Sequence, residues 1–462
     1  MTIRFTASRR RFLGQTTALA SATMLSPLSS TATAMAASAN DRPALGLIGA
    51  GRMGHNHMRF AKGMCDLVAV CDVDSNHRQK AIDKIFDGDA KNAKGFVDYR
   101  KVLDMDEVDV VYIATPDHWH AKILIEAMRA GKDVYCEKPL TLTIDEGKKV
   151  RQVEKETGRI VQVGTMQRSY LDLFVKAVAM AGDGRLGRIT RATAAIGGGG
   201  GSGPIPEHDV PQWLDWNQWL GPAPETPFRW TPDPKLGPDD WVIGKTNCHQ
   251  TFRSWLDYSG GSMTDWGAHH VDISMWAFRQ AGQSDTVVSV GGESKFPVPY
   301  QDGYPTRKDQ YHTASSFSMT ATMSDGTELV INSGGRNGVL LEGTKGRIFV
   351  SRGDLTGKPV EDLQDDPLPA DAIAKTYKGL PTPYSEHKNH WANFFHCTRE
   401  RVEPISDVTS HLRAIDLCHL ANISARFDRP MRWDGDKEEI VGDDAANALL
   451  SREYRKGFEI QG

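Results

Sequence analysis

A glycine-rich loop between a short apolar run and a helical segment constrains this sequence most. The run Ala44–Ile48 leads directly into Gly49, Gly51 and Gly54, and the following residues have a helical pattern through Phe60. In this setting the first glycine permits a tight turn, the second lets a pyrophosphate approach the backbone, and the third lets helix and strand pack closely. The helix N-terminus then faces the negative charge. The loop therefore predicts a dinucleotide-binding site.

Two kinds of strand pattern follow along the chain. Apolar runs at 67–71, 108–114 and 134–136 alternate with amphipathic segments, as in parallel strands joined by helices. Later, a strand pattern at 189–195 and alternating apolar residues at 317–323 and 329–331 predict antiparallel strands with one buried face. We therefore predict an α/β protein: a Rossmann domain (doubly wound parallel sheet) at 37–168 and a C-terminal α+β domain with a largely antiparallel open sheet at 169–462.

Asp72 ends the second strand pattern, where a Rossmann fold places the carboxylate that accepts hydrogen bonds from the adenosine ribose. Its charge would repel the 2′-phosphate of NADP, so NAD is the expected cofactor. NADP stays open as an alternative, because His77 and Arg78 are close enough in the sequence to compensate for a phosphate.

The first 36 residues have the features of an export leader. A run of arginines at 9–11 precedes Phe12-Leu13, a modestly apolar stretch and a small-residue cleavage site that ends at Ala36. This order predicts a twin-arginine signal peptide at 1–36, recognition by the twin-arginine export machinery, and a periplasmic or otherwise exported protein. A solvated basic tail is the alternative.

Composition excludes other classes of partner. A net charge of −4 gives no basic surface for nucleic acid, and no later apolar run is long enough to span a membrane. The six cysteines have no CxxC spacing, which favours free, packed thiols over disulfides or a zinc site.

The segment 114–120 follows a strand pattern, at the edge where a doubly wound sheet opens its ligand crevice. A turn that starts a helix capped by Asp117 is the alternative for any single side chain there. The residues predicted to shape the cofactor pocket from this segment are Thr115, Pro116, His118 and His120.

Two distant motifs supply candidate catalytic groups. Lys138 follows the strand pattern at 134–136, which directs an ammonium group toward the crevice. On a helix, Asp265, His269 and Asp272 would share one stripe, so that two carboxylates orient an imidazole for proton transfer.

A metal centre at the same helix is the weaker interpretation. His270 would point about 100° away from the stripe of its neighbour His269, so these two rings and Asp272 diverge. No metal ion is therefore expected in the site. The alternatives that stay open are a structural histidine at His269 and a surface ion pair at Glu137-Lys138.

At this point the chain resembles the glucose-fructose oxidoreductase, inositol dehydrogenase and MocA (Gfo/Idh/MocA) family. The resemblance covers nearly all of the mature chain and rests on the order of six motifs, at 49–54, 115–117, 137–139, 265–272, 343–346 and 404–407. It implies that Lys138 and His269 are catalytic, that Asp265 is their polar partner, and that the protein is a homodimer or homotetramer. The full predicted set of dinucleotide-binding residues is Gly49, Gly51, Arg52, Met53, Gly54, Asp72, Thr115, Pro116, His118, His120, Glu137 and Lys138.

The expected substrate is a small carbohydrate. Eight of the eleven tryptophans lie between Trp213 and Trp276, and aromatic faces suit the apolar face of a pyranose, although tryptophans also simply pack. Arg168 could bond substrate hydroxyls or form a surface ion pair. A helix that begins near 385 is a further candidate wall. The predicted substrate-binding residues are Arg168, Asp265, His269 and Trp255.

These features lead to one main functional hypothesis and two alternatives. The main hypothesis is an NAD(P)-dependent oxidoreductase that transfers a hydride between a secondary alcohol of a sugar or polyol and nicotinamide. Because free dinucleotide is scarce outside the cytoplasm, the first alternative keeps NAD tightly bound and uses it transiently, in a glycosidase or lyase reaction or to couple two sugars. The resemblance supports this, since exported NAD-dependent α-N-acetylgalactosaminidases are similar to the family. The second alternative is a non-catalytic periplasmic carbohydrate-binding protein.

Overall fold

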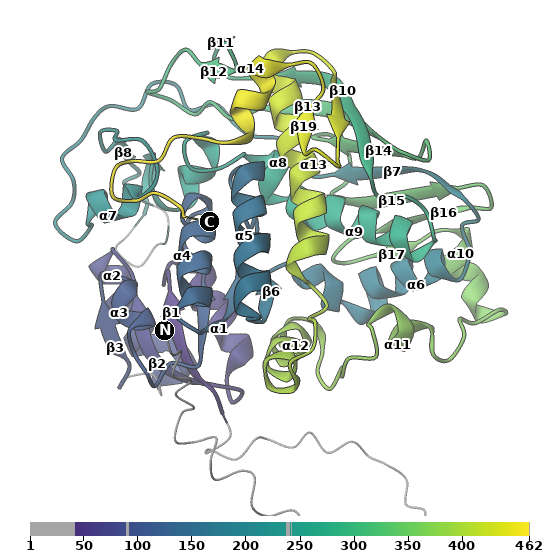
Figure 1. Ribbon diagram of the computed structural model, residues 1–462, viewed down its shortest axis with the longest axis horizontal. Helices are drawn as coiled ribbons and strands as arrows, with labels where there is room; N and C mark the ends of the chain where they lie inside the picture. The colour runs from purple at the N-terminus through teal and green to yellow at the C-terminus, as the bar shows by residue number, and fades with distance from the viewer. Residues whose placement is uncertain (1–41, 89–91, 237–240, 242, 462) are drawn as a thin grey trace, which may run out of the picture. The chain divides into compact units, whose positions relative to one another are not determined.

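The two parts of the chain build sheets of different kinds. The computed structural model describes residues 42–88, 92–236, 241 and 243–461, so the predicted leader at 1–36 lies outside the described residues. A six-stranded sheet comes from the N-terminal part and a nine-stranded sheet from the C-terminal part (Figure 1). The predicted fold class is confirmed, and the limits at 37–168 and 169–462 stay a prediction.

The six-stranded sheet is parallel throughout, in the order β3-β2-β1-β4-β5-β6. The order reverses between β1 and β4, which is where doubly wound sheets open a crevice. Its strands are β1 (Ala44–Ile48), β2 (Asp66–Cys71), β3 (Lys94–Phe96), β4 (Val110–Ile113), β5 (Asp133–Cys136) and β6 (Val161–Val163). The helices between them are α1 (Arg52–Ala61), α2 (Ser75–Lys84), α3 (Arg100–Leu103), α4 (Asp117–Arg129) and α5 (Ile144–Thr157).

Local sequence sets the ends of these helices. The Asp74 carboxylate accepts hydrogen bonds from the backbone N–H groups of Asn76 and His77 at the start of α2. The Thr143 side chain does the same for Glu146 at the start of α5. Gly158 ends α5 with a φ of 60°, a left-handed conformation that glycine adopts without steric cost.

The nine-stranded sheet is antiparallel except where β7 pairs with β14, and it contains the predicted hairpin β13–β14. Phe317, Met319, Ala321 and Met323 of β13 are buried and alternate with more exposed residues. The sheet consists of β17 (Leu355–Thr356), β16 (Arg347–Val350), β15 (Gly338–Gly343), β7 (Ile189–Ala195), β14 (Glu328–Asn332), β13 (Ser316–Met323), β10 (Val287–Lys295), β18 (Met431–Asp434) and β19 (Glu439–Ile440).

Helices from the C-terminal part connect the two sheets. The long helix α13 (Val408–Phe427) packs against α5, against α9 (Gly267–Gln280) and against β10 (Figure 1). It is apolar on most sides, as expected for a helix with neighbours all round. Helix α12 (Glu386–Glu400) packs on α1, and α6 (Lys176–Gly182) packs on α9. The short helix α8 (Ser262–Asp265) ends just before α9 begins.

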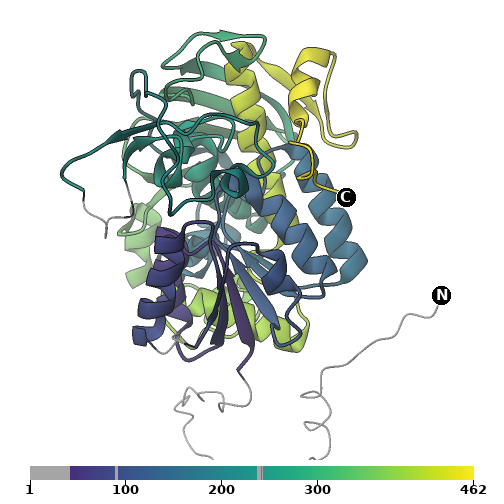
Figure 2. The same ribbon diagram turned by 90° about the vertical axis from the view of Figure 1, so that its left-hand side faces the viewer.

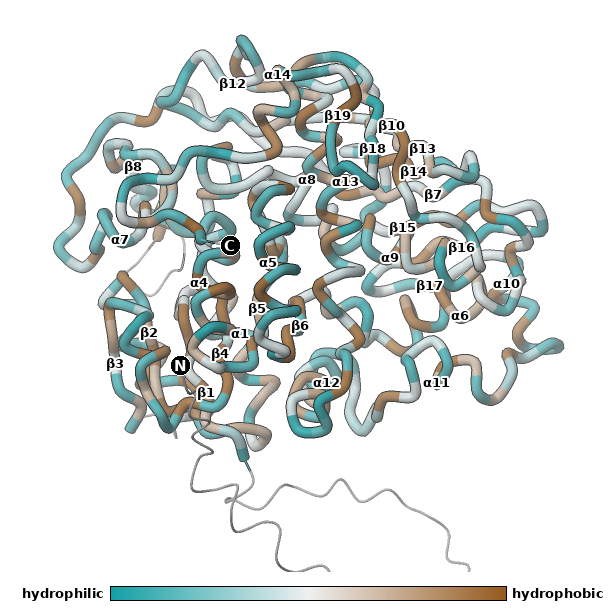
Figure 3. Tube along the Cα trace, viewed as in Figure 1, coloured by the Kyte–Doolittle hydropathy of each residue, from teal (hydrophilic) through white to brown (hydrophobic). Residues whose placement is uncertain are grey.

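The end of the chain returns to the first sheet. Lys122 of α4 donates to the Glu459 carbonyl, and Lys149 of α5 donates to the Ile460 carbonyl. Figure 2 shows this terminal segment, in yellow, beside those helices. In Figure 3, β1 and β4 are hydrophobic whereas α5 carries many hydrophilic residues, which matches a buried sheet beneath a partly solvated helix.

A separate apolar cluster lies in the segment between β7 and α8. It includes Trp216, Trp219, Phe228, Cys248 and Trp255. Among the described residues, no helix has both the length and the apolar character needed to cross a membrane. The remaining elements are α7 (Trp216–Leu220), β8 (Trp230–Pro232), β9 (Gly244–Thr246), β11 (Tyr300–Gln301), β12 (Tyr304–Pro305), α10 (Lys358–Glu361), α11 (Ala372–Thr376) and α14 (Asp444–Asn447).

Candidate functional site

A cavity of about 570 Å³ lies at the carboxyl ends of β1, β2, β4 and β5. This is the edge at which a doubly wound sheet binds its ligand. Residues from both parts of the chain line it. Of the predicted site residues, those at the cavity wall are Gly49, Gly51, Arg52, Met53, Asp72, Thr115, Pro116, His120, Glu137, Lys138, Asp265 and His269.

The three glycines of the loop meet three different surroundings. A Cβ on Gly49 would lie 2.6 Å from the backbone of Ala114, and the residue has a φ of 90°. A Cβ on Gly54 would lie 2.1 Å from the Gly49 carbonyl oxygen. At Gly51 the nearest atom is Nδ1 of His77, 3.8 Å away. Gly49 and Gly54 are thus required by packing, whereas Gly51 leaves space open to the cavity where a pyrophosphate fits.

Asp72 closes one end of the cavity. Its carboxylate accepts hydrogen bonds from the backbone N–H groups of Ala50, at 2.7 Å, and of Asp74, at 2.9 Å. Burial raises the pKa of the Asp72 carboxyl, while His77 opposes this shift. Arg78 donates to the Asp72 carbonyl oxygen, so its guanidinium is already engaged by the backbone.

The loop after β4 and the start of α4 place some side chains at the cavity wall and others in the core. Thr115 lines the cavity, and its buried hydroxyl has no hydrogen-bond partner among the described residues. The ring of His120 lies between the carbonyl oxygens of Pro139, at 2.7 Å, and Thr115, at 2.8 Å, and so ties two loops of the site together. His118 does not line the cavity: its Nε2 lies 3.0 Å from the carbonyl oxygen of Trp219 in the buried aromatic cluster.

The structure brings Lys138 and Asp265 together from opposite parts of the chain. Lys138 Nζ lies 2.5 Å from Oδ1 of Asp265 and 2.9 Å from its carbonyl oxygen. Arg253 Nε donates to the same Oδ1 at 3.1 Å. Burial would raise the pKa of the Asp265 carboxyl, but Lys138 and Arg253 together hold it well below its usual range. Asp265 is therefore a carboxylate that fixes two cations at the cavity wall.

His269 stands at the same wall and is only 5% exposed. Burial lowers the pKa of its imidazole well below the ordinary value, and the charges of Lys138 and Arg352 lower it further. Its Nδ1 has no hydrogen-bond partner among the described residues. His269 is thus a neutral imidazole at the cavity wall, which is the state that a proton acceptor needs.

Glu137 connects the site to α1. Its Oε1 lies 2.9 Å from Nδ1 of His57, and the Tyr112 hydroxyl donates to it at 2.9 Å. Burial would raise the pKa of this carboxyl, but His57 and Lys138 lower it by a larger amount. Glu137 therefore adds a second buried negative charge beside Lys138.

Three residues that were expected near the substrate are buried away from the cavity: Arg168, Asp272 and Trp255. The guanidinium of Arg168 is 2% exposed and binds both oxygens of Asp272, at 2.5 and 2.7 Å, in a sealed pair. The predicted stripe of Asp265, His269 and Asp272 is wrong for the same reason, since Asp272 faces Arg168. Trp255 is 2% exposed and donates to the Thr246 carbonyl within the aromatic cluster.

The alternative metal centre at His269 is not favoured by these contacts. Nε2 of His270 lies 3.0 Å from Oδ1 of Asn337, and Asp272 is occupied by Arg168. The tryptophan-rich segment contributes only in part: Trp219 lines the cavity, whereas Trp213, Trp216 and Trp230 do not. From the same segment Trp241 and Trp266 also line the cavity, and Trp119 lines it from outside the segment.

Several residues at the cavity wall were not predicted as site residues. Arg253 lies in a short 3-10 helix (His249–Ser254) and Arg352 in a bend, and no sequence motif marks either residue. The Arg352 guanidinium lies 4.7 Å from the Trp266 ring centroid. His387 opens the helix that the sequence offered as a wall, and its Nε2 lies 2.8 Å from the Tyr170 hydroxyl.

Two family models match this chain. The first, described as an oxidoreductase family with an NAD-binding Rossmann fold, matches residues 44–165. The second, described as the C-terminal alpha/beta domain of the oxidoreductase family, matches residues 199–460.

Individual relatives match in sequence over the first part. The inositol 2-dehydrogenase of Salmonella typhimurium (strain LT2) is 32% identical over 171 residues, which are 36% of this chain and 48% of that protein. The inositol 2-dehydrogenase of Rubrobacter xylanophilus is 36% identical over 133 residues, 28% of this chain and 37% of that protein. The chain thus matches about half, or less, of the length of these curated relatives.

Solved structures share the fold over most of the chain. The aldose-aldose oxidoreductase from Caulobacter crescentus has a TM-score of 0.57 at 17% identity, covering 85% of this chain and 99% of that one. The WlbA dehydrogenase from Bordetella pertussis, in complex with NADH and UDP-GlcNAcA, has a TM-score of 0.56 at 18% identity, with coverages of 85% and 99%. Since the family models match more than half of its length, the chain belongs to the Gfo/Idh/MocA family of oxidoreductases, with an NAD-binding Rossmann fold and the family's C-terminal domain.

Proposed function

We propose that this protein transfers a hydride between a secondary alcohol of a sugar or polyol and nicotinamide. One observation carries the proposal: Lys138, Asp265 and His269 lie in the same cavity as the glycine loop. The inositol 2-dehydrogenases matched in sequence support a polyol or sugar as the substrate class.

The cavity fits a dinucleotide at the loop end. The open space at Gly51, the N-terminus of α1 and the Asp72 carboxylate form the cradle that a pyrophosphate and a ribose require. Bound NAD would supply the hydride acceptor. Asp72 favours NAD over NADP, because Arg78 is held by a backbone carbonyl.

The other end of the cavity supplies the proton chemistry. His269 is neutral, lines the cavity and would take the hydroxyl proton on its imidazole ring. Lys138 would donate a hydrogen bond to the same substrate oxygen and stabilise its developing negative charge. Asp265 and Arg253 are positioning residues in this scheme, because they fix the Lys138 ammonium group.

The wall around His269 suits a sugar ring. Trp266 offers an aromatic face, while Arg253, Arg352 and His387 offer polar groups. Arg168 and Trp255 are absent from this part of the proposal because both are sealed in the core.

A redox-neutral reaction with retained NAD is the second candidate. The chain crosses the Asp72 end of the cavity: Ser75 N donates to the Trp213 carbonyl at 2.9 Å, and Asp215 N donates to the Val73 carbonyl at 3.0 Å. Such cover supports a cofactor that dissociates slowly. With the predicted leader at 1–36, it favours loading of NAD before export and a periplasmic location as parts of the same proposal. A homo-oligomer, which the family resemblance implies, also belongs to the proposal.

The experiment follows both cofactor and product. The purified full chain is first tested for retained dinucleotide, and then offered free polyols, aldoses and glycosides. Steady NADH accumulation supports the dehydrogenase and contradicts the redox-neutral reaction. Product release without net NADH supports the redox-neutral reaction. Full turnover in Lys138→Ala and His269→Ala would contradict both, and sugar binding with no turnover in the unaltered protein would indicate a carbohydrate-binding protein.

A further inference from the structure

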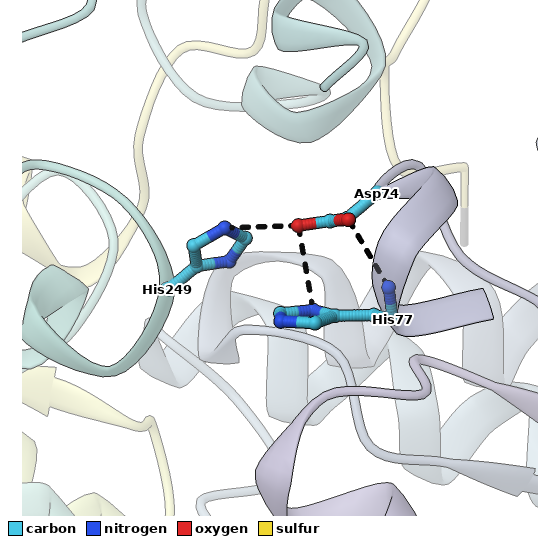
Figure 4. Close-up of side chains that lie close together, drawn as sticks. All are labelled: Asp74, His77 and His249. Carbon is cyan, nitrogen blue, oxygen red and sulfur yellow. Dashed lines mark hydrogen bonds and ion pairs between the residues drawn. The ribbon is translucent and has the colours of Figure 1, made fainter. Parts of the chain in front are cut away.

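A second cluster of ionisable side chains lies away from the catalytic group. Asp74 and His77 stand at the start of α2, and His249 begins a 3-10 helix (His249–Ser254) in the other part of the chain. One ligand-type atom from each residue lies within 4.8 Å of the other two. Figure 4 shows both imidazole rings turned toward the Asp74 carboxylate.

The spacing of the three atoms is that of metal ligands. Oδ2 of Asp74 lies 3.6 Å from Nδ1 of His77 and 3.2 Å from Nε2 of His249. Two ligand atoms bound tetrahedrally to Zn²⁺ at their usual bond lengths lie roughly 3.3 Å apart. Both contacts with Oδ2 are close to this spacing, and all three ligand atoms lie within 4.8 Å of one another.

The two oxygens of Asp74 have different roles. Oδ1 accepts the backbone N–H groups of Asn76 and His77, at 2.8 and 3.1 Å, and thereby caps α2. This cap fixes the carboxylate and leaves Oδ2 directed at the rings. The same residue can therefore hold the helix and offer one ligand atom.

His249 extends the cluster from the other part of the chain. Its side chain is 8% exposed, and its Nε2 pairs with Oδ2 of Asp74 at 3.2 Å. The pair places a buried carboxylate oxygen and an imidazole nitrogen at a spacing that one shared ion can bridge. Trp213 stacks on this ring at 5.9 Å, and Trp241 packs on His77 at 5.1 Å, which limits rotation of both imidazoles.

We propose that Asp74, His77 and His249 bind a divalent first-row transition metal ion, for which Zn²⁺ is the probe. Two imidazoles and one carboxylate suit such an ion better than Mg²⁺ or Ca²⁺, which prefer oxygen ligands. The ion joins the loop after β2 to the segment that contains His249. His77 and His249 also line the cavity beside Asp72. A bound ion therefore holds the segment that contains His249 in place over that end of the cavity. Slower loss of NAD is a consequence that rests on the proposed function, whereas metal binding itself does not.

The first measurement is metal content. The full chain is purified with a tag that contains no histidine, analysed by mass spectrometry of its metals, stripped with a chelator and titrated with Zn²⁺ or Co²⁺. We expect about one equivalent per chain and the visible absorption of tetrahedral Co²⁺. A stripped protein that takes up no metal would overturn the proposal, and the contact would then be a plain ion pair.

Matched variants locate the ion. Asp74→Asn keeps an oxygen for the helix cap but removes the anionic ligand, and His249→Gln keeps a hydrogen-bonding group beside Asp74. Both are expected to weaken Zn²⁺ binding by about 10–100-fold or more. His55→Ala is the control, because His55 packs on the same Trp241 at 5.3 Å but lies outside the cluster, and it should retain the metal. Equal binding in all variants would place the ion elsewhere and overturn the proposal.

The effect of the metal ion on the rate of NAD dissociation is measured separately. NAD dissociation is timed in the zinc-loaded and stripped protein, and zinc is expected to slow it about tenfold. Zinc binding with unchanged NAD release would leave the metal site standing and remove its cofactor role. Absence of any NAD binding would contradict the proposed function without affecting the metal measurement.

Discussion

Two buried pairs of a basic residue and an aspartate have opposite surroundings, although their aspartates lie only seven residues apart in the chain. Lys138 and Asp265 line the cavity, and Asp265 keeps 20% of its side chain exposed. Arg168 and Asp272 are 2% and 1% exposed, and the carbonyl of Ile405 takes a further guanidinium hydrogen bond. The first pair can act on a ligand, whereas the second can only hold the two parts of the chain together.

The glycine loop repeats this contrast on a smaller scale. Gly51 faces the cavity, whereas Gly54 faces the backbone of Gly49. In both cases a single motif supplies one residue to the ligand and one to the core. The motif alone does not say which is which, and four measurements can test the division.

The largest expected effect is at His269. His269→Ala removes the proposed proton acceptor, so kcat/KM should fall by about 10²–10⁴-fold while the melting temperature changes little. Steady-state kinetics and thermal unfolding measure the two quantities. His208→Ala, an exposed histidine outside the cavity, is the control and should keep full activity. An equal loss in both variants would show that the assay reports something other than this site.

Substitutions in the two ion pairs should affect the free energy of unfolding and the turnover rate to different degrees. Asp272→Ala leaves the Arg168 charge buried without its partner, so the free energy of unfolding should fall by about 3–5 kcal/mol in denaturant titrations. Asp265→Asn should cost less stability, because its surroundings reach the cavity, but should lower kcat strongly.

A larger loss of stability in Asp265→Asn than in Asp272→Ala would contradict the division between a cavity pair and a core pair. If Asp272→Ala does not fold, the double variant Arg168→Leu with Asp272→Leu gives the same information, since an apolar pair restores much of the stability of a buried ion pair. Restored folding together with unchanged NAD binding would confirm that this pair is structural.

The glycine loop offers a smaller version of the same test. Gly54→Ala places a Cβ against the Gly49 oxygen and should lower the free energy of unfolding by about 1–3 kcal/mol. Gly51→Ala meets no close protein atom, so it should leave unfolding unchanged and weaken NAD binding instead. Calorimetric NAD titration and denaturant unfolding distinguish them, and equal unfolding effects would contradict the packing described for the loop.

The smallest effect concerns pH. His269 must be neutral to accept a proton, and its pKa is lowered by burial and by the charge of Lys138. The acid side of the kcat/KM profile should therefore fall only well below the usual histidine range. Lys138→Met removes one of these charges, so the residual activity should show its acid limb shifted upward by roughly one pH unit. A downward shift would mean that the limb belongs to another group.

Much of the cofactor half could be predicted from the sequence. The strand at 44–48, the glycine loop and Asp72 are consecutive in the chain, and their geometry follows from local rules of turn, helix and strand. The prediction failed where a residue's neighbours are far away. Arg168 follows a strand pattern much as Lys138 does, but its guanidinium forms an ion pair with the carboxylate of Asp272, 104 residues later in the chain.

The sequence by itself determined the Rossmann unit, the glycine cradle and the identity of Lys138, Asp265 and His269 as candidates, because each is marked by a short pattern. Only the tertiary structure decided which side of the cavity wall each residue faces. It turned Asp272 and Trp255 into the core, brought Arg253 and Arg352 to the site, and placed His249 beside Asp74. The reason is physical: burial and charge pairing depend on neighbours in space, and the packing of α8, α9 and the aromatic cluster against the first sheet sets those neighbours.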